Sequence, residues 1–325
     1  MNLIGFDIGG TTCACVFGKK TKSGSIEIID KIGFPTQVGP KATIEEIFKK
    51  TALLLSRNNL KNEEIAGIGI SCGGPLDSKN GIVLSPPNLP GWDEIPIVEL
   101  TEQHFNIKAF VQNDANACAM AEWKYGAGRG YDNVAFFTFG TGMGSGLILD
   151  GKLYSGTTDL AGEVGHIRLS ETGPVGFGKD GSFEGWCSGG GIAQVGQMYA
   201  RRRIQMGEKV AYCSSLDELP KITAKSIAEA AFNGDPTANE VYRVCSEYLG
   251  RGLSIIIDII NPQVIILGSI FIRSKELIED HMWRVIQEES IKYSADSCSI
   301  VPAELGESIG DMAALVLAVE ASSKS

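Results

Sequence analysis

Two segments of the chain share a strand–glycine turn–strand pattern, and this pattern limits the folds that the sequence is compatible with. In the first, the apolar residues 3–8 reach a Gly-Gly-Thr-Thr turn and continue as an apolar strand at residues 13–17. In the second, residues 134–139 reach a Gly-Thr-Gly-Met-Gly turn and continue at residues 146–149. A strand that returns through a tight glycine turn forms a hairpin, not a strand-to-helix unit. The repetition predicts an internal duplication, with two similar domains facing each other.

Helical and strand patterns alternate through the rest of the chain, which predicts an α/β fold. The first helix is expected to begin at Thr43 with a capping box to Glu46. We expect an N-terminal domain of residues 1–116, on which a C-terminal helix of about residues 306–325 packs, and a second domain of residues 117–305. Helices are expected at residues 43–57, 115–125, 190–205, 224–232, 236–260 and 312–321, and buried strands at residues 65–71, 107–111 and 264–267.

The composition excludes several classes of protein. The 325 residues suffice for two domains with a large core, and 43% apolar with 21% charged residues is ordinary for a globular protein. The net charge is −10 and the only basic block is residues 201–203, which disfavours a nucleic-acid partner. Apolar runs are too short to span a membrane, and Asp7 interrupts any signal core. Eight cysteines without paired spacing indicate free thiols, so we expect a cytoplasmic protein.

Residues 111–117 mark the junction between a predicted strand and a predicted helix. Asn113 and Asp114 lie where backbone N–H groups are unpaired and the helix dipole is positive. A carboxylate at that point either caps the helix or serves as a catalytic base at the carboxyl edge of a sheet, where open α/β folds bind ligands. Either way, the helix start is expected to orient the carboxylate of Asp114 and to favour its ionised form.

The two glycine turns are candidate phosphate-binding loops. They present backbone N–H groups with no side chain in the way, although either turn alone also suits a simple tight hairpin. Two such turns on opposed domains would hold the two ends of a polyphosphate. Asp7 lies beside the first turn, where its carboxylate either faces a nucleotide-bound Mg²⁺, usually through water, or hydrogen-bonds its own turn.

Two other nucleotide-binding folds fit the sequence poorly. The phosphate-loop motif G-x-x-x-x-G-K-[ST] does not occur in the chain. Ser145 stands where a dinucleotide-binding fingerprint needs glycine or alanine, and the segment after it reads as a strand and not as a helix. A dehydrogenase is therefore disfavoured.

A group of amide and acidic side chains is suited to binding a polyol. Glu163 and His166 lie three residues apart in a glycine-flanked loop, and a histidine in such a place is otherwise most often a structural hydrogen-bonding residue. Sugars are held by planar acceptors and amides of this kind. The set expected to act together is Asn88, Asn113, Glu163 and Glu184.

Taken in order, these motifs resemble the signature blocks of the ROK family, which comprises bacterial sugar kinases and repressors of the actin/hexokinase-like superfamily. The resemblance covers nearly the whole chain. Its blocks are the segments at residues 5–11, 73–75, 87–92, 113–117, 140–144, 162–166 and 261–268. It implies two actin/hexokinase-like (ribonuclease H-like) α/β domains with a cleft for sugar and ATP between them.

The resemblance also implies a role for each matching residue. Asp114 matches the family's general base, which takes the proton from a sugar hydroxyl, usually O6. The implied sugar-binding residues are Gly74, Asn88, Asn113, Glu163, His166 and Glu184. The implied ATP-binding residues are Asp7, on the magnesium side, with Gly9, Gly10, Thr11, Thr12, Gly140, Thr141, Gly142 and Gly268.

The chain departs from the family in one loop. The family commonly holds zinc with the histidine of its G-E-x-G-H block and three cysteines of a C-x-C-G-x-x-G-C-x-E block. Here the three cysteine positions carry Val175, Phe177 and Ser182, so thiolate coordination of zinc is impossible. We expect Val175 and Phe177 to hold the loop by apolar packing and to leave His166 free for the sugar. Ser145 and Ser269-Ile270 also stand where the family often has glycine.

The function expected from this resemblance is ATP-dependent phosphorylation of a hexose, glucose or a related aldohexose, at the 6-hydroxyl, with Mg²⁺ carried by ATP. The alternatives are an N-acetylhexosamine (N-acetylmannosamine or N-acetylglucosamine) kinase, a fructokinase, and a sugar-sensing regulator without kinase activity. Regulators of the family carry an additional N-terminal winged helix-turn-helix, whereas the first phosphate strand here begins at Leu3, which favours the kinase. A homodimer is expected.

The cysteine-free loop leads to a prediction about metal content. We expect protein purified without added zinc to contain no stoichiometric zinc, because the chain lacks the thiolates that structural zinc sites use. Elemental analysis of the dialysed protein checks this. One tightly held zinc per chain would contradict the prediction.

Overall fold

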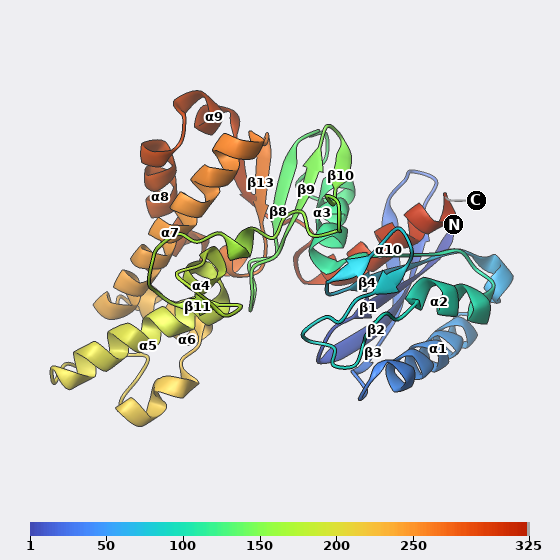
Figure 1. Ribbon diagram of the computed structural model, residues 1–325, viewed down its shortest axis with the longest axis horizontal. Helices are drawn as coiled ribbons and strands as arrows, with labels where there is room; N and C mark the ends of the chain where they lie inside the picture. The colour runs from blue at the N-terminus through green and yellow to red at the C-terminus, as the bar shows by residue number, and fades with distance from the viewer. Residues whose placement is uncertain (324–325) are drawn as a thin grey trace. The chain divides into compact units, whose positions relative to one another are not determined.

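The computed structural model describes residues 1–323, which contain two five-stranded sheets. The N-terminal sheet has the order β3-β2-β1-β4-β7 (Figure 1). Strands β1 and β2 form the first predicted hairpin, β3 extends it antiparallel, and β4 and β7 add parallel strands. The strand bounds are β1 Asn2–Ile8, β2 Thr12–Lys20, β3 Ile26–Pro35, β4 Ile65–Cys72 and β7 Ala109–Asn113.

The second sheet has the order β10-β9-β8-β13-β14. Counted along the chain, each sheet therefore places its strands in the order third, second, first, fourth, fifth, and in each the last two strands run parallel to their neighbours. The predicted duplication and the α/β class are thus confirmed. The strand bounds are β8 Val134–Phe137, β9 Ser145–Leu149, β10 Lys152–Tyr154, β13 Val264–Leu267 and β14 Ser299–Pro302.

Two compact units account for the chain. Unit 1 comprises residues 1–132, 146–161 and 304–325, and unit 2 comprises residues 133–145 and 162–303. Unit 1 therefore contains the whole of helix α3 (Asp114–Tyr125). After unit 2, the chain returns to unit 1 at residue 304. The functional division predicted at residue 116 stays a prediction.

The helix α10 (Ile309–Ser322) of unit 1 lies directly on the N-terminal sheet (Figure 1). Nine of its fourteen residues are buried, and most of them are Ala, Leu or Val. The sheet meets this helix with glycines in β1 and β4. A Cβ atom on Gly69 would lie 2.0 Å from the carbonyl oxygen of Ala314, and one on Gly67 would lie 2.4 Å from that of Ala318. Only a strand without side chains at these positions admits the helix backbone so closely.

The helices α1 (Pro40–Arg57) and α2 (Ile97–Phe105) contribute Ile44, Ile47 and Phe105 to the apolar core that also contains Phe6 and Ile70 of the sheet. The predicted capping box of α1 is wrong. The helix begins three residues earlier, with Gly39 as N-cap and Pro40 at its first turn, a position that suits proline. The hydroxyl of Thr43 instead donates to the carbonyl oxygens of Gln37 and Gly39.

Unit 2 carries most of the other helices. The three helices predicted there, at residues 190–205, 224–232 and 236–260, agree with the structure to within a residue. The bounds of the unit 2 helices are α4 Phe183–Cys187, α5 Gly189–Gln205, α6 Ala224–Phe232, α7 Pro236–Ile260, α8 Ile270–Glu289 and α9 Lys292–Ser297.

Short elements occur in both units. The short strands are β5 Leu76–Asp77, β6 Ile82–Val83, β11 Val175–Gly176 and β12 Lys179–Asp180. The 3-10 helices are η1 Asn62–Glu64, η2 Val164–His166, η3 Leu216–Lys221 and η4 Gly306–Ser308.

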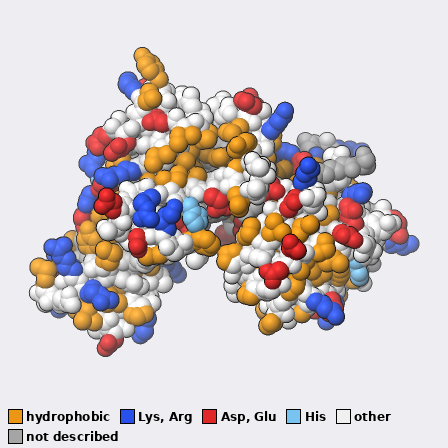
Figure 2. All heavy atoms as spheres, viewed as in Figure 1, with side chains coloured by type: hydrophobic (Ala, Val, Ile, Leu, Met, Phe, Trp, Pro, Cys, Tyr) orange, Lys and Arg blue, Asp and Glu red, His pale blue; other side chains and the backbone are white. Residues whose placement is uncertain are grey.

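The surface carries both signs of charge. On the face drawn in Figure 2, Lys and Arg side chains lie among Asp and Glu side chains. Within residues 1–323, no helix combines the length and the apolar character that crossing a bilayer requires.

The contact between β4 and α10 makes a testable prediction about stability. We expect Gly69→Ala to lower the free energy of unfolding by about 3 kcal/mol or more, because the new methyl group would overlap main-chain atoms of α10. Denaturant titration measures the change. Gly33→Ala in β3 is the matched control, since its Cβ atom would meet its nearest neighbour at 3.9 Å. Equal stability of the two variants would show that α10 does not need the glycine.

Candidate active site

The junction between β7 and α3 is built around the side chain of Asn113. This residue ends β7 and is the N-cap of α3, with its Oδ1 atom accepting hydrogen bonds from the N–H groups of Ala115 at 3.0 Å and Asn116 at 3.4 Å. Asp114 is the first residue of the helix, and its Oδ1 accepts from the same Ala115 N–H at 2.8 Å. The capping role considered for Asp114 thus belongs mainly to Asn113. The carboxylate of Asp114 lies at the helix N-terminus with its side chain exposed.

Neighbouring polar residues hold this junction in place. The buried Gln112 accepts the N–H of Asn113 at 2.7 Å and the side-chain amide of Asn116 at 3.3 Å. Gly74 approaches the junction from the loop after β4. A Cβ atom on this glycine would lie 3.0 Å from Nδ2 of Asn113. Gly74 therefore leaves room for the amide group of Asn113, and both lie in unit 1 with Asp114.

The first glycine turn lies at the end of β1, in the same unit. The N–H of Gly9 donates to the carbonyl oxygen of Thr12 at 3.1 Å. Thr36, which directly follows β3, donates its hydroxyl to the carbonyl oxygen of Gly9 at 2.6 Å. A Cβ atom on Gly10 would lie 2.6 Å from Cβ of Asn88. The turn is thus in contact with one predicted sugar-binding residue, and Gly10, Thr11 and Thr12 are exposed to solvent.

Acidic side chains surround the carboxylate of Asp7. Burial, the charge of Asp311 and the charge of Asp114 raise its pKa to about 6, and Lys31 partly opposes this rise. Lys31 lies 2.7 Å from Asp311, a residue of α10 that the sequence analysis did not single out. The negative charges of Asp311 and Asp114 thus act on Asp7, and a cation carried by a ligand would oppose their effect.

The pKa of Asp114 differs from the sequence-based expectation. The helix start was expected to favour the ionised form, and hydrogen bonds from the backbone do lower the pKa. Burial among surrounding protein outweighs them and raises the pKa above its ordinary value, although the side chain keeps an exposed surface. The carboxyl group therefore binds a proton more strongly than an ordinary aspartate.

The second glycine turn belongs to unit 2 and lies beside the start of a helix. Within the turn, the N–H of Gly140 donates to the carbonyl oxygen of Gly142 at 3.0 Å. The first residues of α5 then bond back to it: the N–H of Gly189 donates to Gly140 at 2.7 Å and that of Gly190 donates to Thr141 at 3.2 Å. Glycines at the start of α5 allow this approach, and the sequence analysis did not assign them a role.

A pocket of about 760 Å³ opens beside the second turn, within unit 2. The apolar side chains of Ile222 and Phe232 and the cationic side chains of Lys225 and Arg273 line it. Gly140, Thr141, Gly189, Gly190, Ser269 and Ile270 also belong to its wall. A cavity of this size with a glycine turn at one end and apolar and basic walls could hold a nucleotide. No local motif predicts its walls, because α5, α6 and α8 contribute them separately.

Gly268 follows β13 and lies against the end of β8. Its N–H donates to the carbonyl oxygen of Phe137 at 2.9 Å, and a Cβ atom on it would lie 2.9 Å from the carbonyl oxygen of Thr138. The next residue, Ser269, has φ +43° and caps α8. Glycine would adopt that backbone conformation without strain, which is a physical reason for a glycine at position 269. Arg273 donates to the Ser269 hydroxyl at 3.1 Å.

The predicted sugar-binding residues of unit 2 lie near this second turn. Glu184, in α4, accepts the N–H of Met143 at 2.9 Å, and a Cβ atom on Gly142 would lie 2.9 Å from the same carboxylate oxygen. Glu163 precedes η2 and His166 ends it, with the N–H of His166 donating to the carbonyl oxygen of Glu163 at 3.2 Å. The turn, Glu163, His166 and Glu184 therefore form one neighbourhood within unit 2.

The loop that replaces the family's cysteine block is held differently from our expectation. Val175 and Phe177 are 44% and 66% exposed, so apolar packing of these side chains does not hold the loop. Instead, the amide of Gln194 bonds both main-chain groups of Val175, and the buried Ser182 caps α4 through the N–H of Gly185. Within residues 1–323, no three His, Cys, Asp or Glu side chains converge as a metal site. The absence of zinc stays a prediction.

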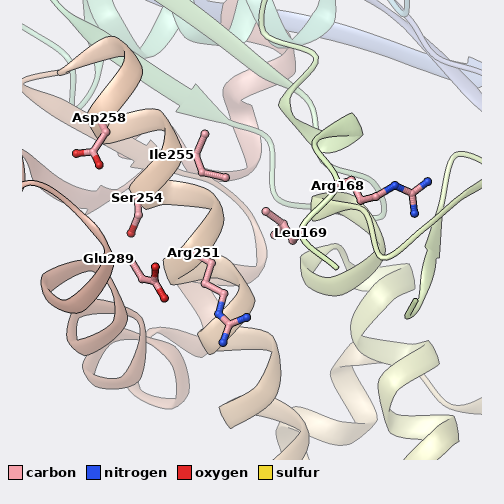
Figure 3. Close-up of a pocket in the computed structure, with 7 residues that line it drawn as sticks. All are labelled: Arg168, Leu169, Arg251, Ser254, Ile255, Asp258 and Glu289. Atoms are coloured by element: carbon pink, nitrogen blue, oxygen red, sulfur yellow. The ribbon is translucent and has the colours of Figure 1, made fainter. Parts of the chain in front are cut away.

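Another pocket of unit 2, about 290 Å³ in volume, contains none of the predicted site residues. Figure 3 shows four of its lining residues on α7, namely Arg251, Ser254, Ile255 and Asp258, with Arg168 and Leu169 on a separate loop and Glu289 at the end of α8. The wall mixes acidic and basic groups.

Comparison with known proteins places this geometry among sugar-binding relatives. The model of the ROK family matches residues 3–321. A glucokinase from Thermotoga maritima is 32% identical over 86% of this chain and 84% of its own length. The structure of a ROK family glucokinase from Streptomyces griseus in complex with glucose and AMPPNP is 29% identical, with a TM-score of 0.77, over 98% of this chain and 100% of that chain. A xylose repressor from Caldicellulosiruptor bescii is 30% identical over 70% of this chain and 55% of its own length.

The raised pKa of Asp7 predicts a pH dependence of stability. The folded carboxyl binds a proton up to a pKa of about 6, whereas the unfolded one releases it near 3.8, so the folded state holds more protons between these values. The stability that Asp7 contributes is therefore complete below pH 3.8 and is lost as the pH rises through 6. Asp7→Asn should be more stable than wild type by about 1–3 kcal/mol near pH 8, and the difference should vanish near pH 4.

Denaturant titration of the ligand-free protein at several pH values measures this difference. Asp217→Asn, at an exposed position, controls for the loss of one negative charge. An Asp7→Asn variant that is no more stable than wild type near pH 8 would contradict the prediction.

Proposed function

Because the chain belongs to the ROK family, we propose that it is an ATP-dependent kinase that phosphorylates the 6-hydroxyl of a hexose, with glucose or a related aldohexose as the first candidate. The observation that carries the proposal is the carboxylate of Asp114, exposed at the N-terminus of α3 beside the first glycine turn and Asp7. The glucokinase relatives support the choice of substrate class. The N-acetylhexosamines and fructose remain alternative substrates.

In this proposal Asp114 is the general base. Its raised pKa suits the role, since a base whose pKa approaches the working pH accepts a proton more readily. Six residues bind the sugar in two groups. Gly74, Asn88 and Asn113 belong to unit 1, and Glu163, His166 and Glu184 belong to unit 2. The amide Nδ2 of Asn113 is the donor offered to a hydroxyl, because its Oδ1 is used by the helix cap.

The nucleotide is proposed to bind through both glycine turns. The second turn, with Gly140, Thr141 and Gly142, binds phosphate. The purine and ribose would lie in the adjoining 760 Å³ pocket. Gly268 packs against Phe137 and Thr138, which lead into this turn. In unit 1, Gly9, Gly10, Thr11 and Thr12 bind phosphate. Asp7 would lie on the side of the Mg²⁺ that ATP carries and would offset its charge.

Most of the rate enhancement in phosphoryl transfer comes from alignment and charge stabilisation. The bound Mg²⁺–ATP supplies the phosphoryl group and neutralises its charge. The residues of this chain hold the hexose hydroxyl in line, and Asp114 accepts its proton. The helix cap made by Asn113 fixes the direction in which that carboxylate points.

We also propose that the protein works in the cytoplasm as a homodimer, with functional domains of residues 1–116 and 117–305. Its eight cysteines are free and buried, which is compatible with a reducing compartment. Light scattering on purified protein tests the dimer.

A second candidate is a sugar-responsive regulator without kinase activity. The similarity to a xylose repressor favours it, whereas Asp114 would then have no proton to accept. A coupled assay of ADP release over a panel of hexoses decides between the two. We expect turnover with at least one aldohexose. Sugar binding by calorimetry without turnover on any member of the panel would favour the regulator.

The role of Asp114 has its own test. Asp114→Asn should lower kcat by ~10²-fold or more, the usual range for loss of an acid–base group, while the Kd for the sugar changes little. Steady-state kinetics and calorimetry measure the two quantities. Glu122, buried in the same helix, is no suitable control, so Asp217→Asn serves again. Near-normal turnover of Asp114→Asn would refute the assignment.

A further inference from the structure

The hairpin of β11 and β12 has a turn that its sequence does not favour. Its two strands pair Gly176 with Lys179, so Phe177 and Gly178 form a two-residue turn. Both have positive φ angles, +45° for Phe177 and +73° for Gly178, which defines a type I′ turn. Asparagine, aspartate and glycine favour the first position of such a turn, whereas a bulky aromatic residue there is strained. Strain of this kind often marks a functional site.

Burial does not compensate for this strain, because the side chain of Phe177 is 66% exposed. The ring instead contacts His166. The two ring centroids are 5.0 Å apart and the ring planes are inclined at 79°, an edge-to-face arrangement that aromatic pairs prefer. The residue after the turn also reaches His166, since the ammonium group of Lys179 donates to its carbonyl oxygen at 2.7 Å. Both sides of the turn therefore converge on one histidine.

The base of the hairpin is fixed firmly enough to keep the ring in place. Gln194 of α5 bonds both the N–H and the carbonyl oxygen of Val175, at 2.9 and 2.8 Å. The buried Ser182 holds the next residue of β11 by donating its hydroxyl to the carbonyl oxygen of Gly176 at 3.4 Å. Glu184 follows two residues later, in α4. The hairpin is thus anchored to the two helices that border the candidate sugar site of unit 2.

We infer that Phe177 is a positioning residue that sets the orientation of the His166 imidazole and thereby the affinity for the hexose. The main-chain bonds of His166 fix its backbone, and the contact with Phe177 restricts the side chain. An imidazole that is already oriented loses less freedom when it binds a hydroxyl group. The effect on affinity rests on the proposed function, whereas the effect on the imidazole does not.

Phe177→Asn separates this role from a structural one, because asparagine suits the turn better than phenylalanine does. We expect the unfolding midpoint to stay equal or to rise by about 1–4 °C, since strain is relieved. The KM for the hexose should nevertheless rise roughly 3- to 10-fold with kcat nearly unchanged, which is the range expected for losing one aromatic pair. Phe177→Tyr keeps the ring and should restore wild-type KM. Val175→Asn, an apolar-to-polar change at an exposed position of the same hairpin, should leave KM unchanged.

The imidazole itself can be observed without any activity. The chain has three histidines, so the ring resonances of His166 can be assigned with a His166→Gln variant in labelled protein. In the ligand-free state, Phe177→Asn should shift these resonances by removing the ring current, and Phe177→Tyr and Val175→Asn should leave them nearly in place. An unshifted His166 signal in Phe177→Asn would overturn the inference, and so would a shifted signal with unchanged KM. If wild type phosphorylates no hexose, the proposed function fails, while the spectra still decide whether the ring of Phe177 contacts His166.

Discussion

The cap that Asn113 places on α3 is the interaction on which the candidate catalytic group depends. One amide oxygen takes two of the N–H groups that every helix start leaves unpaired. Asp114 occupies the first helical position, and its Oδ1 shares the N–H of Ala115 with Asn113. Gln112 and Asn116, both buried, brace the same turn through one further amide. Three polar residues at the junction of β7 and α3, Gln112, Asn113 and Asn116, thus hold the backbone that carries Asp114.

Electrostatics in unit 1 oppose the stability of the folded chain. Asp7, Asp114 and Asp311 lie close enough for their charges to raise the pKa of Asp7, and only Lys31 counters them. A structure that keeps like charges together in the absence of ligand gains the most from binding a cation. Under the proposed function, the polyphosphate of ATP with its metal ion would bind beside both Asp7 and the glycine turn.

Much of the fold could be predicted from the sequence because local patterns encode it. Glycine turns between apolar strands predicted both hairpins, and the matching of the two predicted the duplicated sheets. The start of α1 was misplaced because Gly39 and Pro40 begin the helix without a side-chain cap, a signal weaker than the apparent box at Thr43. The site residues on turns and helix starts carry recognisable motifs. The pocket wall contributed by Lys225, Phe232 and Arg273, by contrast, depends on how separate helices pack, and the raised pKa of Asp114 depends on burial.

The glycines of β1 and β4 have a consequence for how the chain is made. Their surface is complete only when α10 lies on it, and α10 follows all the residues of unit 2 along the chain. Unit 2 is encoded in between, so a ribosome releases all of its residues before unit 1 can close. Domains usually finish in the order in which they are translated. In this protein, synthesis of unit 1 begins before that of unit 2, but unit 1 can finish folding only after unit 2 has been synthesised. The glycines of β1 and β4 therefore stay uncovered until α10 is made.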